Sequence, residues 1–507
     1  MSEKHDDTLS VLLVYPDTRE AALGAPGFRE VLRALGRDES VRVTWGWYNE
    51  SSESVVLESG GQGGYDVIAV SVPFEPLYFN AVKSLLGCGI EPERARRASD
   101  EPKVLFGGIA PTLNPAIAGA IADSVFIGEA DVAASEAVRS TAAIQRKKTG
   151  AAIKLTPMTG MQIPGFNSAA PRFTIPRETI DSTFFEGFDQ PAESAFPDSG
   201  LVEVGRGCGR GCRFCAAGHA YLPVRHRSAS AILSDVKTYK NKAGRIGLVG
   251  ASVSDHRDLN AVMRGAIELG FGISTSSFRA DMLDCECASI LVEGGVRTVT
   301  IAPEGGSERI RSIINKRLTR YEIIDAARVS AETGITNLRL YYMIGLPWEM
   351  PEDIDAIGTL TAEIRTAFGP GGSVTVSLNP FIPKPQTPFQ WCAMAGEKYV
   401  EDAYRRISAT IRSIPGVRIK TMSVRMAVRE ALLSLGDEAV GRAVVRNVRD
   451  GVPWKRALRD EHVDVDGLIH REKEPEEIFP WDDLTGTQKK AALRASYKDA
   501  ERTARSI

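Results

Sequence analysis

The sequence predicts an α/β protein in three parts: an open, doubly wound sheet, a partial parallel barrel of six strand–helix units, and a mainly helical C-terminal region. Short apolar runs alternate with helical patterns over residues 1–150 and again over 199–394. Alternation of this kind is typical of parallel sheets covered by helices. Over residues 395–507 the pattern is helical and highly charged, which predicts the mainly helical C-terminal region.

The first part contains five short apolar runs. Strands are predicted at 10–15, 41–45, 66–72, 103–106 and 124–127, with helices at 79–86 and 115–121. Apolar runs of this length are typical of strands buried in a parallel sheet. Two of the runs lead into glycine turns, Gly107-Gly108 and Gly128-Glu129. The pattern therefore predicts one sheet with helices on both faces.

Residues 151–198 are rich in Pro, Gly, Ser and Thr, which predicts a long connection. The strand–helix alternation then resumes. Strands are predicted at 201–204, 245–249, 272–276, 298–302, 337–344 and 373–378, and helices at 229–240, 320–333 and 354–368. Six such units form a partial or full parallel barrel, in which reactive side chains gather at the C-terminal ends of the strands.

Length and charge restrict the class of protein. At 507 residues the chain exceeds one ordinary core, so two or three domains are expected. A net charge of -3 and 43% hydrophobic residues are typical of a soluble globular protein and provide no overall positive field for nucleic acid. The polar start is unlike a secretory signal, and no apolar run approaches the roughly 18 residues that span a bilayer. A cytoplasmic location without a membrane partner is expected.

Three of the seven cysteines, Cys208, Cys212 and Cys215, lie close together, and the other four are scattered. An odd number does not suit a secreted disulfide framework. The distribution suits a reducing compartment and one dedicated metal site. The scattered thiols are expected to be small buried hydrophobes or surface groups.

The run CGRGCRFC, from Cys208 to Cys215, follows directly on the first predicted barrel strand. Three thiolates at this spacing can hold one face of a four-iron four-sulfur cluster and leave the fourth iron open. The amino and carboxylate groups of S-adenosylmethionine can chelate such an iron. Phe214 can shield the cluster from water. A structural zinc site is the alternative, but it needs a fourth ligand, and His219 is the only one close by.

CGRGCRFC resembles the signature of the radical S-adenosylmethionine (radical SAM) superfamily. The resemblance implies that the cluster donates one electron to bound S-adenosylmethionine, and that the resulting 5′-deoxyadenosyl radical abstracts a hydrogen atom from the substrate. It also implies cofactor contacts at successive strand ends. Matching positions here are Ser252 after the second strand, Ser277 and Arg279 after the third, Glu304 after the fourth, and Ile344 with Gly345 at the end of the fifth.

The implied roles differ among these positions. Ser252 stands where the family usually has Gly-Gly-Glu, so the group that holds the methionine amine stays open. Ser277 and Arg279 resemble the pair that meets the ribose and carboxylate, and Glu304 can take a hydroxyl or ammonium group. Ile344 and Gly345 resemble the adenine-binding edge. Solvent-facing loops and a plain strand-to-loop transition are the alternatives, and Ser307 suits a helix cap.

Longer runs resemble one branch of the superfamily, which has an N-terminal cobalamin-binding-like Rossmann domain and includes a largely uncharacterised bacterial group. They are APEGGSERIRSIINK, LYYMIGLPWE and NPFIPKPQTPFQW, and the similarity covers about 66–481. The turns at Gly107-Gly108 and Gly128 resemble those that cradle the nucleotide tail of cobalamin. The lower-ligand motif D-x-H-x-x-G is missing, and the only N-terminal histidine is His5.

Several functions remain open. The resemblance implies a radical SAM enzyme, either a cobalamin-dependent methyltransferase or a cobalamin-independent enzyme of another reaction type. A non-catalytic RNA- or protein-binding relative is a further alternative, and a methylthiotransferase fits poorly because Cys88 is the only N-terminal cysteine. The expected partners are an electron donor such as flavodoxin or ferredoxin and a small or macromolecular substrate.

Basic and aromatic side chains near the cysteines are further candidates. Arginines around and after the motif can bind S-adenosylmethionine's carboxylate, the charge of the cluster, a phosphate-bearing substrate or an RNA backbone. These are Arg206, Arg210, Arg213, Arg225 and Arg227. His219, Tyr221 and Tyr342 are candidate proton or radical partners.

Overall fold

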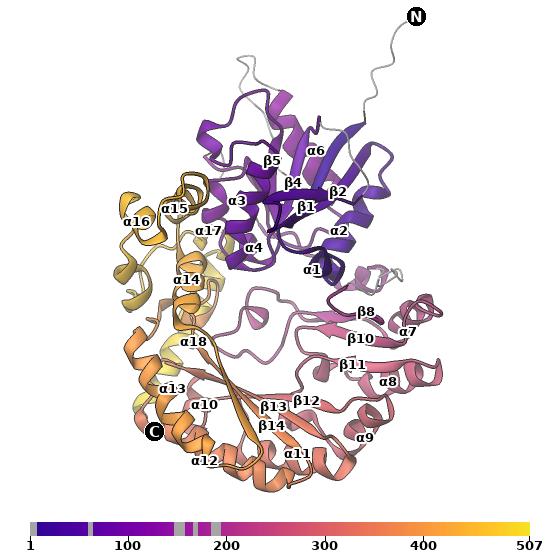
Figure 1. The fold of residues 1–507 in the computed structure, drawn as a ribbon, viewed down its shortest axis with the longest axis vertical. Helices are drawn as coiled ribbons and strands as arrows, with labels where there is room; N and C mark the ends of the chain where they lie inside the picture. The colour runs from indigo at the N-terminus through magenta and orange to yellow at the C-terminus, as the bar shows by residue number, and fades with distance from the viewer. Residues whose placement is uncertain (1–7, 59–63, 147–157, 166–170, 184–193, 507) are drawn as a thin grey trace, which may run out of the picture.

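The computed structural model describes residues 8–58, 64–146, 158–165, 171–183 and 194–506, and the descriptions below concern these ranges. An N-terminal sheet domain lies opposite a curved parallel sheet, and C-terminal helices join the two (Figure 1). No helix in the described ranges is long and apolar enough to cross a membrane.

The N-terminal domain is a seven-stranded sheet of order β3-β2-β1-β4-β5-β6-β7. Its parallel centre consists of β1, β2, β4, β5 and β6, and the outer strands β3 and β7 are antiparallel to their neighbours. The strands are β1 (Leu9–Tyr15), β2 (Val41–Asn49), β3 (Ser54–Leu57), β4 (Val67–Ser71), β5 (Lys103–Gly107), β6 (Ser124–Phe126) and β7 (Met161–Gln162).

Helices cover both faces of this sheet, which confirms the predicted doubly wound arrangement. Apolar side chains of α2 (Pro26–Gly36) and α6 (Ala134–Arg146) form one core with the sheet. On the other face, α3 (Tyr78–Gly87) shares its core with α15 (Glu438–Arg449), a helix from the far end of the chain. Short helices α1 (Arg19–Leu23), α4 (Ile109–Leu113) and α5 (Ala116–Gly119) follow strand ends or connect elements.

The second part is a curved parallel sheet that matches the six predicted barrel strands. They are β8 (Ser199–Arg206), β10 (Arg245–Gly250), β11 (Gly272–Thr275), β12 (Thr298–Glu304), β13 (Asn337–Ile344) and β14 (Ser373–Pro380). Two shorter strands, β9 (Arg225–His226) and β15 (Val417–Thr421), lie at the ends of this sheet. A single parallel bridge between Phe278 and Ile301 connects the halves β11-β10-β8-β9 and β12-β13-β14-β15, so the curve continues across them. The partial barrel is therefore confirmed.

Helices lie on the outer side of this curved sheet (Figure 1). They are α7 (Ala229–Thr238), α8 (Leu259–Glu268), α9 (Cys285–Glu293), α11 (Arg320–Thr333), α12 (Pro351–Phe368) and α13 (Glu397–Arg412). A further short helix, α10 (Glu308–Ile313), follows β12. Buried side chains from these helices and from both halves of the sheet form one continuous apolar core.

Two strands lie in segments where the sequence predicted none. Strand β7 lies inside 151–198, the predicted connection. Its two residues pair with β6 at the sheet edge. Strand β15 (Val417–Thr421) lies inside 395–507, the predicted helical extension, and pairs in parallel with β14. The barrel therefore has a seventh parallel strand. The charged sequence VRIKT hides it, because this strand is partly exposed at the sheet edge.

The rest of the C-terminal region is helical, as predicted. It comprises α14 (Val424–Leu435), α15, α16 (Trp454–Asp460), α17 (Asp482–Thr485) and α18 (Thr487–Ser506). Asn114 of the N-terminal domain donates hydrogen bonds to the carbonyls of Ser434 (3.0 Å) and Gly436 (2.7 Å). Leu493 and Tyr497 of α18 belong to an apolar cluster with Ile313 of α10. The C-terminal region therefore packs on both other parts.

Candidate functional site

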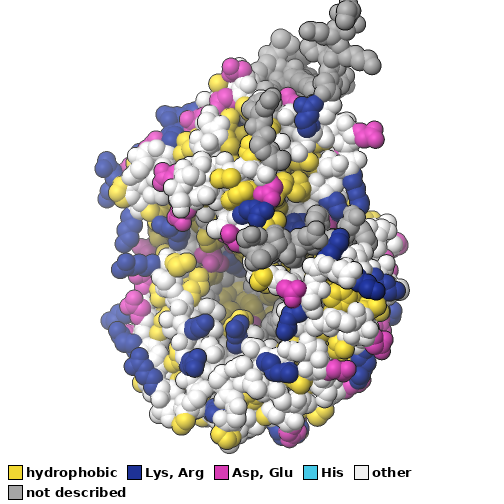
Figure 2. Space-filling view, turned by 45° about the vertical axis from the view of Figure 1, so that its right-hand side comes forward, with side chains coloured by type: hydrophobic (Ala, Val, Ile, Leu, Met, Phe, Trp, Pro, Cys, Tyr) yellow, Lys and Arg dark blue, Asp and Glu magenta, His cyan; other side chains and the backbone are white. Residues whose placement is uncertain are grey.

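A hollow lies between the N-terminal domain and the barrel (Figure 2). In Figure 1, α4 lies at the edge of the N-terminal domain that faces the barrel. Figure 2 shows the hollow between the two parts, with hydrophobic side chains in its depth and Lys and Arg side chains along its lower rim. Clefts between domains are common places for ligand sites.

The three neighbouring cysteines lie on a loop that turns back on itself directly after β8. Gly207 adopts a φ of +76°, and a Cβ added there would lie 2.5 Å from the carbonyl oxygen of Tyr221. Only glycine fits such a close approach. The amide of Cys208 donates to the carbonyl of Ala217 at 3.2 Å, which closes the loop. The local sequence thus brings the far end of the loop beside its start.

Burial disfavours ionisation of two of these thiols, those of Cys212 and Cys215. It raises the pKa of Cys212 to about 11, and the neighbouring Cys215 adds to the effect. Burial also raises the pKa of Cys215, although the amides of Ala217 and Gly218 donate to its sulfur and oppose the increase. Thiolates are the metal-binding form. A bound metal centre supplies the positive charge that such buried thiolates need.

The described ranges contain no group of three or more His, Cys, Asp or Glu side chains close enough to hold one metal ion. A four-iron cluster with one open iron takes only the three thiolates of this loop, whereas a structural zinc ion needs a fourth ligand. His219, the candidate fourth zinc ligand, has its Nε2 3.0 Å from the carbonyl oxygen of Cys212.

Arg210 ties this loop to the ends of β10 and β11. Its Nε lies 3.0 Å from both carboxylate oxygens of Asp255, and its Nη1 lies 3.4 Å from Asp281. Two of the predicted contacts belong to the same network. Ser252 donates to Asp255 at 2.7 Å, and Arg279 donates to Asp281 at 2.9 and 3.1 Å. The side chains of Ser252 and Arg279 are therefore already engaged with carboxylates.

Arg213 ties the other side of the loop to α10 and α18. It is buried, and its Nη1 donates to the carbonyls of Ser312 (3.2 Å) and Ile313 (2.6 Å). It also pairs with the carboxylate of Asp499 on the last helix. The neighbouring Phe214 packs against the apolar cluster that includes residues of α10 and α18. The cysteine loop is thus held between the barrel and the C-terminal helix.

Glu304 ends β12 close to the cysteine loop. It has a φ of +67°, unusual for a residue with a side chain. Its Oε1 lies 3.2 Å from Lys316 Nζ, and its charge contributes to the raised pKa of Cys212. Ser277, at the end of β11, is exposed. Ser307 accepts from the amide of Ile310 at 3.0 Å, which confirms its role as a helix cap.

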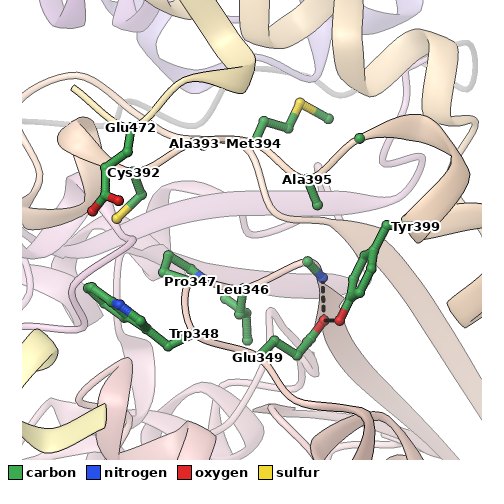
Figure 3. A pocket seen from close by; sticks show the side chains of 12 residues that line it. Leu346, Pro347, Trp348, Glu349, Cys392, Ala393, Met394, Ala395, Tyr399 and Glu472 are labelled. Carbon is green, nitrogen blue, oxygen red and sulfur yellow. Dashed lines mark hydrogen bonds between the residues drawn. The ribbon is translucent and has the colours of Figure 1, made fainter. Parts of the chain in front are cut away.

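The fifth-strand positions Ile344 and Gly345 already have backbone partners. The carbonyl of Ile344 accepts from Phe381 at 2.8 Å, and the amide of Gly345 donates to Glu349 at 2.7 Å. Glu349 also accepts from the Tyr399 hydroxyl at 2.9 Å (Figure 3). Burial raises the pKa of Glu349 to about 7.

These groups line a cavity of about 410 Å³ between the loops that follow β13 and β14 (Figure 3). Gly345, Trp348 and Glu349 come from the first loop, and Cys392, Met394 and Tyr399 from the second loop and the start of α13. Nothing in the sequence pattern indicated this cavity, because its two loops are far apart along the chain.

Close backbone packing accounts for the glycine turns of the N-terminal domain. A Cβ at Gly108 would lie 2.5 Å from the carbonyl oxygen of Val72, and one at Gly128 would lie 2.1 Å from that of Phe173. Both glycines have positive φ, +117° and +127°. The neighbouring Gly107 ends β5 without such a contact. The conformations of Gly108 and Gly128 therefore need no ligand to explain them.

The same strand ends nevertheless expose apolar side chains. Phe74 follows β4 and is 60% exposed, Ile109 follows β5 and is 48% exposed, and Val132 follows β6 and is 69% exposed. Because these strands are neighbours in the sheet, the three side chains lie along one edge. An exposed apolar edge of this kind is typical of an interaction or ligand surface. Residues 8–146 contain no histidine that can ligate cobalt.

Comparison with known proteins agrees with this architecture. The family described as "Radical SAM superfamily" matches residues 202–360, and the one described as "Radical SAM proteins, N-terminal" matches residues 50–164. An uncharacterized protein of Methanocaldococcus jannaschii is 33% identical over 257 residues, which cover 49% of this chain and 55% of that protein.

Among solved structures, the cobalamin-dependent S-adenosylmethionine radical enzyme OxsB shares the fold. Its form with aqua-cobalamin and S-adenosylmethionine aligns with a TM-score of 0.51 and 15% identity, over 83% of this chain and 59% of OxsB. Its apo form aligns with a TM-score of 0.52 and 14% identity, over 89% and 62%. The match thus spans less than two thirds of the length of each of these relatives.

Proposed function

The chain belongs to the radical SAM superfamily, and we propose that it cleaves S-adenosylmethionine reductively at a four-iron four-sulfur cluster held by Cys208, Cys212 and Cys215. The folded loop that presents these three cysteines directly after the first barrel strand carries the proposal. A cluster held by these thiolates would supply S-adenosylmethionine with one electron from a donor such as flavodoxin or ferredoxin. Cleavage would give methionine and a 5′-deoxyadenosyl radical able to take a hydrogen atom from the substrate.

The surrounding side chains have separate parts in this proposal. Arg210 and Arg213 fix the loop from its two sides through carboxylate partners. Phe214 limits the access of water. Glu304, held by Lys316, presents a carboxylate near Cys212 that can accept from an ammonium or hydroxyl group. Ser277 is exposed at its strand end and can donate to the ribose or carboxylate.

Ser252, Arg279, Ile344 and Gly345 support the site in a different way. Their polar groups are bound within the protein, so direct cofactor contact requires that they share or exchange these partners. In the proposal Ser252 and Arg279 position Asp255 and Asp281, and these carboxylates hold Arg210. Gly345 and Ile344 shape the end of β13.

Anaerobic reconstitution with iron and sulfide tests the proposal. The native chain is expected to bind about four irons, to show the absorption and electron paramagnetic resonance of a reducible cluster, and to form 5′-deoxyadenosine with S-adenosylmethionine and dithionite. The Cys212→Ala variant is expected to lose both the spectroscopic signals of the cluster and the formation of 5′-deoxyadenosine. Cys285→Ala, which removes an exposed thiol on α9, is the matched control. Formation of 5′-deoxyadenosine by the Cys212→Ala protein would contradict the proposal.

A second candidate, a cobalamin-dependent methyltransferase, is favoured by the apolar edge of Phe74, Ile109 and Val132 and by the fold shared with OxsB. Cobalamin would lie between this edge and the barrel, where β5 ends at Gly107 and Gly108 precedes α4. Residues 8–146 contain no histidine, so this segment offers no histidine as the lower ligand of cobalt.

Incubation with hydroxocobalamin followed by gel filtration tests this second candidate. We expect a cobalamin absorption band that co-elutes with the native chain and weakens in Phe74→Glu. The exposed Met426→Glu, on α14, serves as the control. A folded, cluster-loaded protein without the band would leave the cobalamin-independent radical enzyme. Absence of 5′-deoxyadenosine as well would favour the non-catalytic RNA- or protein-binding alternative.

A further inference from the structure

The arginines that the sequence marked as phosphate or carboxylate ligands are all bound to carboxylates of the protein. Arg206 contacts Glu203, Asp131 and Glu129. The other four pair with acidic partners in the same way: Arg210 with Asp255, Arg213 with Asp499, Arg225 with Glu129, and Arg227 with Asp235. Their charges are therefore compensated inside the fold, and the sequence-based assignment of an anion to them is not supported.

Lys489, in the first turn of α18, is a partly buried cation that faces no carboxylate in the described ranges. Its Nζ lies 3.3 Å from the amide oxygen of Gln386. Burial, with the positive charge of Arg172 as the second cause, lowers the pKa of Lys489 to about 8. A buried charge without an opposite charge is unfavourable. Such a group indicates a negatively charged ligand.

Arg172 is a second partly buried cation, and Glu129 is the carboxylate whose charge acts on it. Its guanidinium lies 5.7 Å from the centre of the Tyr221 ring, and its Nη1 is buried without a hydrogen-bond partner among the described residues. The hydroxyl of Tyr221 is likewise buried and unpartnered there. The nearby Glu129 is held by Arg225 at 2.6 and 2.8 Å and by the amide of Ile175 at 2.9 Å. Glu129 is therefore already committed.

These groups lie where the cysteine loop meets the underside of the N-terminal domain. Gln386, the partner of Lys489, donates to the carbonyls of Thr112 and Leu113 in α4 at 2.9 and 3.0 Å. The charge of Lys489 also acts on His219, whose ring nitrogen lies 3.0 Å from the carbonyl oxygen of Cys212. Lys489 is therefore close to both the cysteine loop and the edge of the N-terminal sheet that faces the hollow.

We propose that Lys489, Arg172 and the Tyr221 hydroxyl form a binding site for the phosphate group of a small-molecule substrate. A guanidinium and an ammonium beside a hydroxyl are suitable donors for a phosphate, and partial burial strengthens each bond. As a substrate site, it rests on the proposed radical reaction. The site would hold the charged end of the substrate beside the cysteine loop.

Calorimetric titration of the anaerobically reconstituted chain with pyrophosphate tests the site. The native protein is expected to bind one pyrophosphate, and Lys489→Gln and Arg172→Gln are each expected to weaken binding at least tenfold. Lys490→Gln is the matched control, since the next lysine of the same helix already binds Asp482 and the carbonyl of Glu477 at 2.5 and 2.9 Å. It is expected to stay within twofold of the native affinity. Circular dichroism and cluster absorbance verify folding of each variant.

The outcomes separate this inference from the proposed function. No binding by the native protein, or equal affinity in all variants, overturns the site. A change in the cluster's paramagnetic spectrum without a change in pyrophosphate affinity also overturns it, because the two cations would then balance the charge of the cluster. A chain that forms 5′-deoxyadenosine but binds no pyrophosphate keeps its function and loses the site. If pyrophosphate binding depends on Lys489 but the chain forms no 5′-deoxyadenosine, the anion site stands and the proposed radical function does not.

Discussion

At the scale of single residues, the loop that carries the cysteines is positioned by side chains between them. Arg210 stands between Cys208 and Cys212 and contacts both oxygens of Asp255. A planar guanidinium that meets a carboxylate with two hydrogen bonds fixes direction as well as distance. The cysteine spacing states which atoms can bind a cluster, and Arg210 with Asp255 determines where the loop holds them.

Replacement of Asp255 by Asn tests this positioning. The variant is expected to lose on the order of 1 kcal/mol of unfolding free energy, because the pair is partly exposed. We also expect its reconstituted cluster to bleach several-fold faster in air. Urea denaturation and the decay of cluster absorbance measure the two effects. Asp258→Asn, at an exposed ion pair with Arg257, is the control. Unchanged bleaching would show that Arg210 does not position the loop.

Glu349 gives a pH dependence that can be measured without any cofactor. Burial raises its folded-state pKa to about 7 from an ordinary value of 4.5. A carboxyl whose pKa is raised in the folded state makes its full contribution to the free energy of unfolding at pH values below its unfolded-state pKa. This contribution is lost as the pH rises to 7. The loss amounts to roughly 3 kcal/mol at most.

Glu349→Gln is therefore expected to flatten the fall in stability between pH 5 and 8. Urea midpoints at pH 5, 6, 7 and 8 measure this. Glu397→Gln, at an exposed position that starts α13, is expected to follow the native profile. Parallel profiles for the native protein and Glu349→Gln would contradict the assignment.

At the scale of elements, the last helix supports the cysteine loop from outside the barrel. Arg213, inside the motif, pairs with Asp499 of α18 and packs among residues of α10. Tyr497 of the same helix lies 5.8 Å from Trp348 and 5.9 Å from Trp391, measured between ring centres. The helix therefore joins the motif to the loops after β13 and β14. Its role depends on contacts across most of the chain.

Asp499→Ala is expected to leave the buried Arg213 without its carboxylate. Unfolding free energy should fall by about 1–3 kcal/mol, towards the low end because Asp499 is half exposed. Cluster loss on dilution should also be faster. Chemical denaturation and iron release to a chelator measure these changes. The control is Glu501→Ala, which breaks an exposed pair with Arg505 on the same helix. Equal iron release in both variants would argue against support by α18.

At the scale of the whole molecule, the C-terminal region decides how the two sheet domains face one another. Helix α15 completes the core on one face of the N-terminal sheet, and α18 packs against α10 of the barrel. Lys384, in the segment after β14, lies 2.6 Å from Glu75 of the N-terminal domain and 2.9 Å from Glu430 of α14. The hollow is therefore bounded by residues from all three parts.

Gly441→Ala tests this arrangement at the closest contact of α15. A Cβ there would lie 2.5 Å from the carbonyl oxygen of Ile117. Overpacking of this kind is expected to cost about 1–3 kcal/mol and to loosen α15 from the N-terminal domain. Thermal unfolding and limited proteolysis measure the two effects. Gly27→Ala, in a helix with no atom near the added methyl group, is expected to be neutral or slightly stabilising.

The fold class and the three cysteines were predictable from the sequence because both depend on local pattern. Parallel strands buried on both faces appear as apolar runs, and ligand spacing follows from a single loop. Strand β15 was missed because its charged face lies at a sheet edge, and β7 because it has only two residues. Ser307 was correctly predicted as a cap, since capping needs only neighbours in sequence.

By itself, the sequence determined the CGRGCRFC loop after the first barrel strand and the order of domains around it. Only the tertiary structure decided which charges near that loop are compensated. Arg210 and Asp255 are 45 residues apart, and Arg213 and Asp499 are 286 apart, so no spacing rule connects them. Lys489 lies in a polar helix whose sequence pattern does not single it out, and only the fold places it, partly buried, beside Gln386. Burial sets the energetic weight of a charge, and burial is a property of the folded chain.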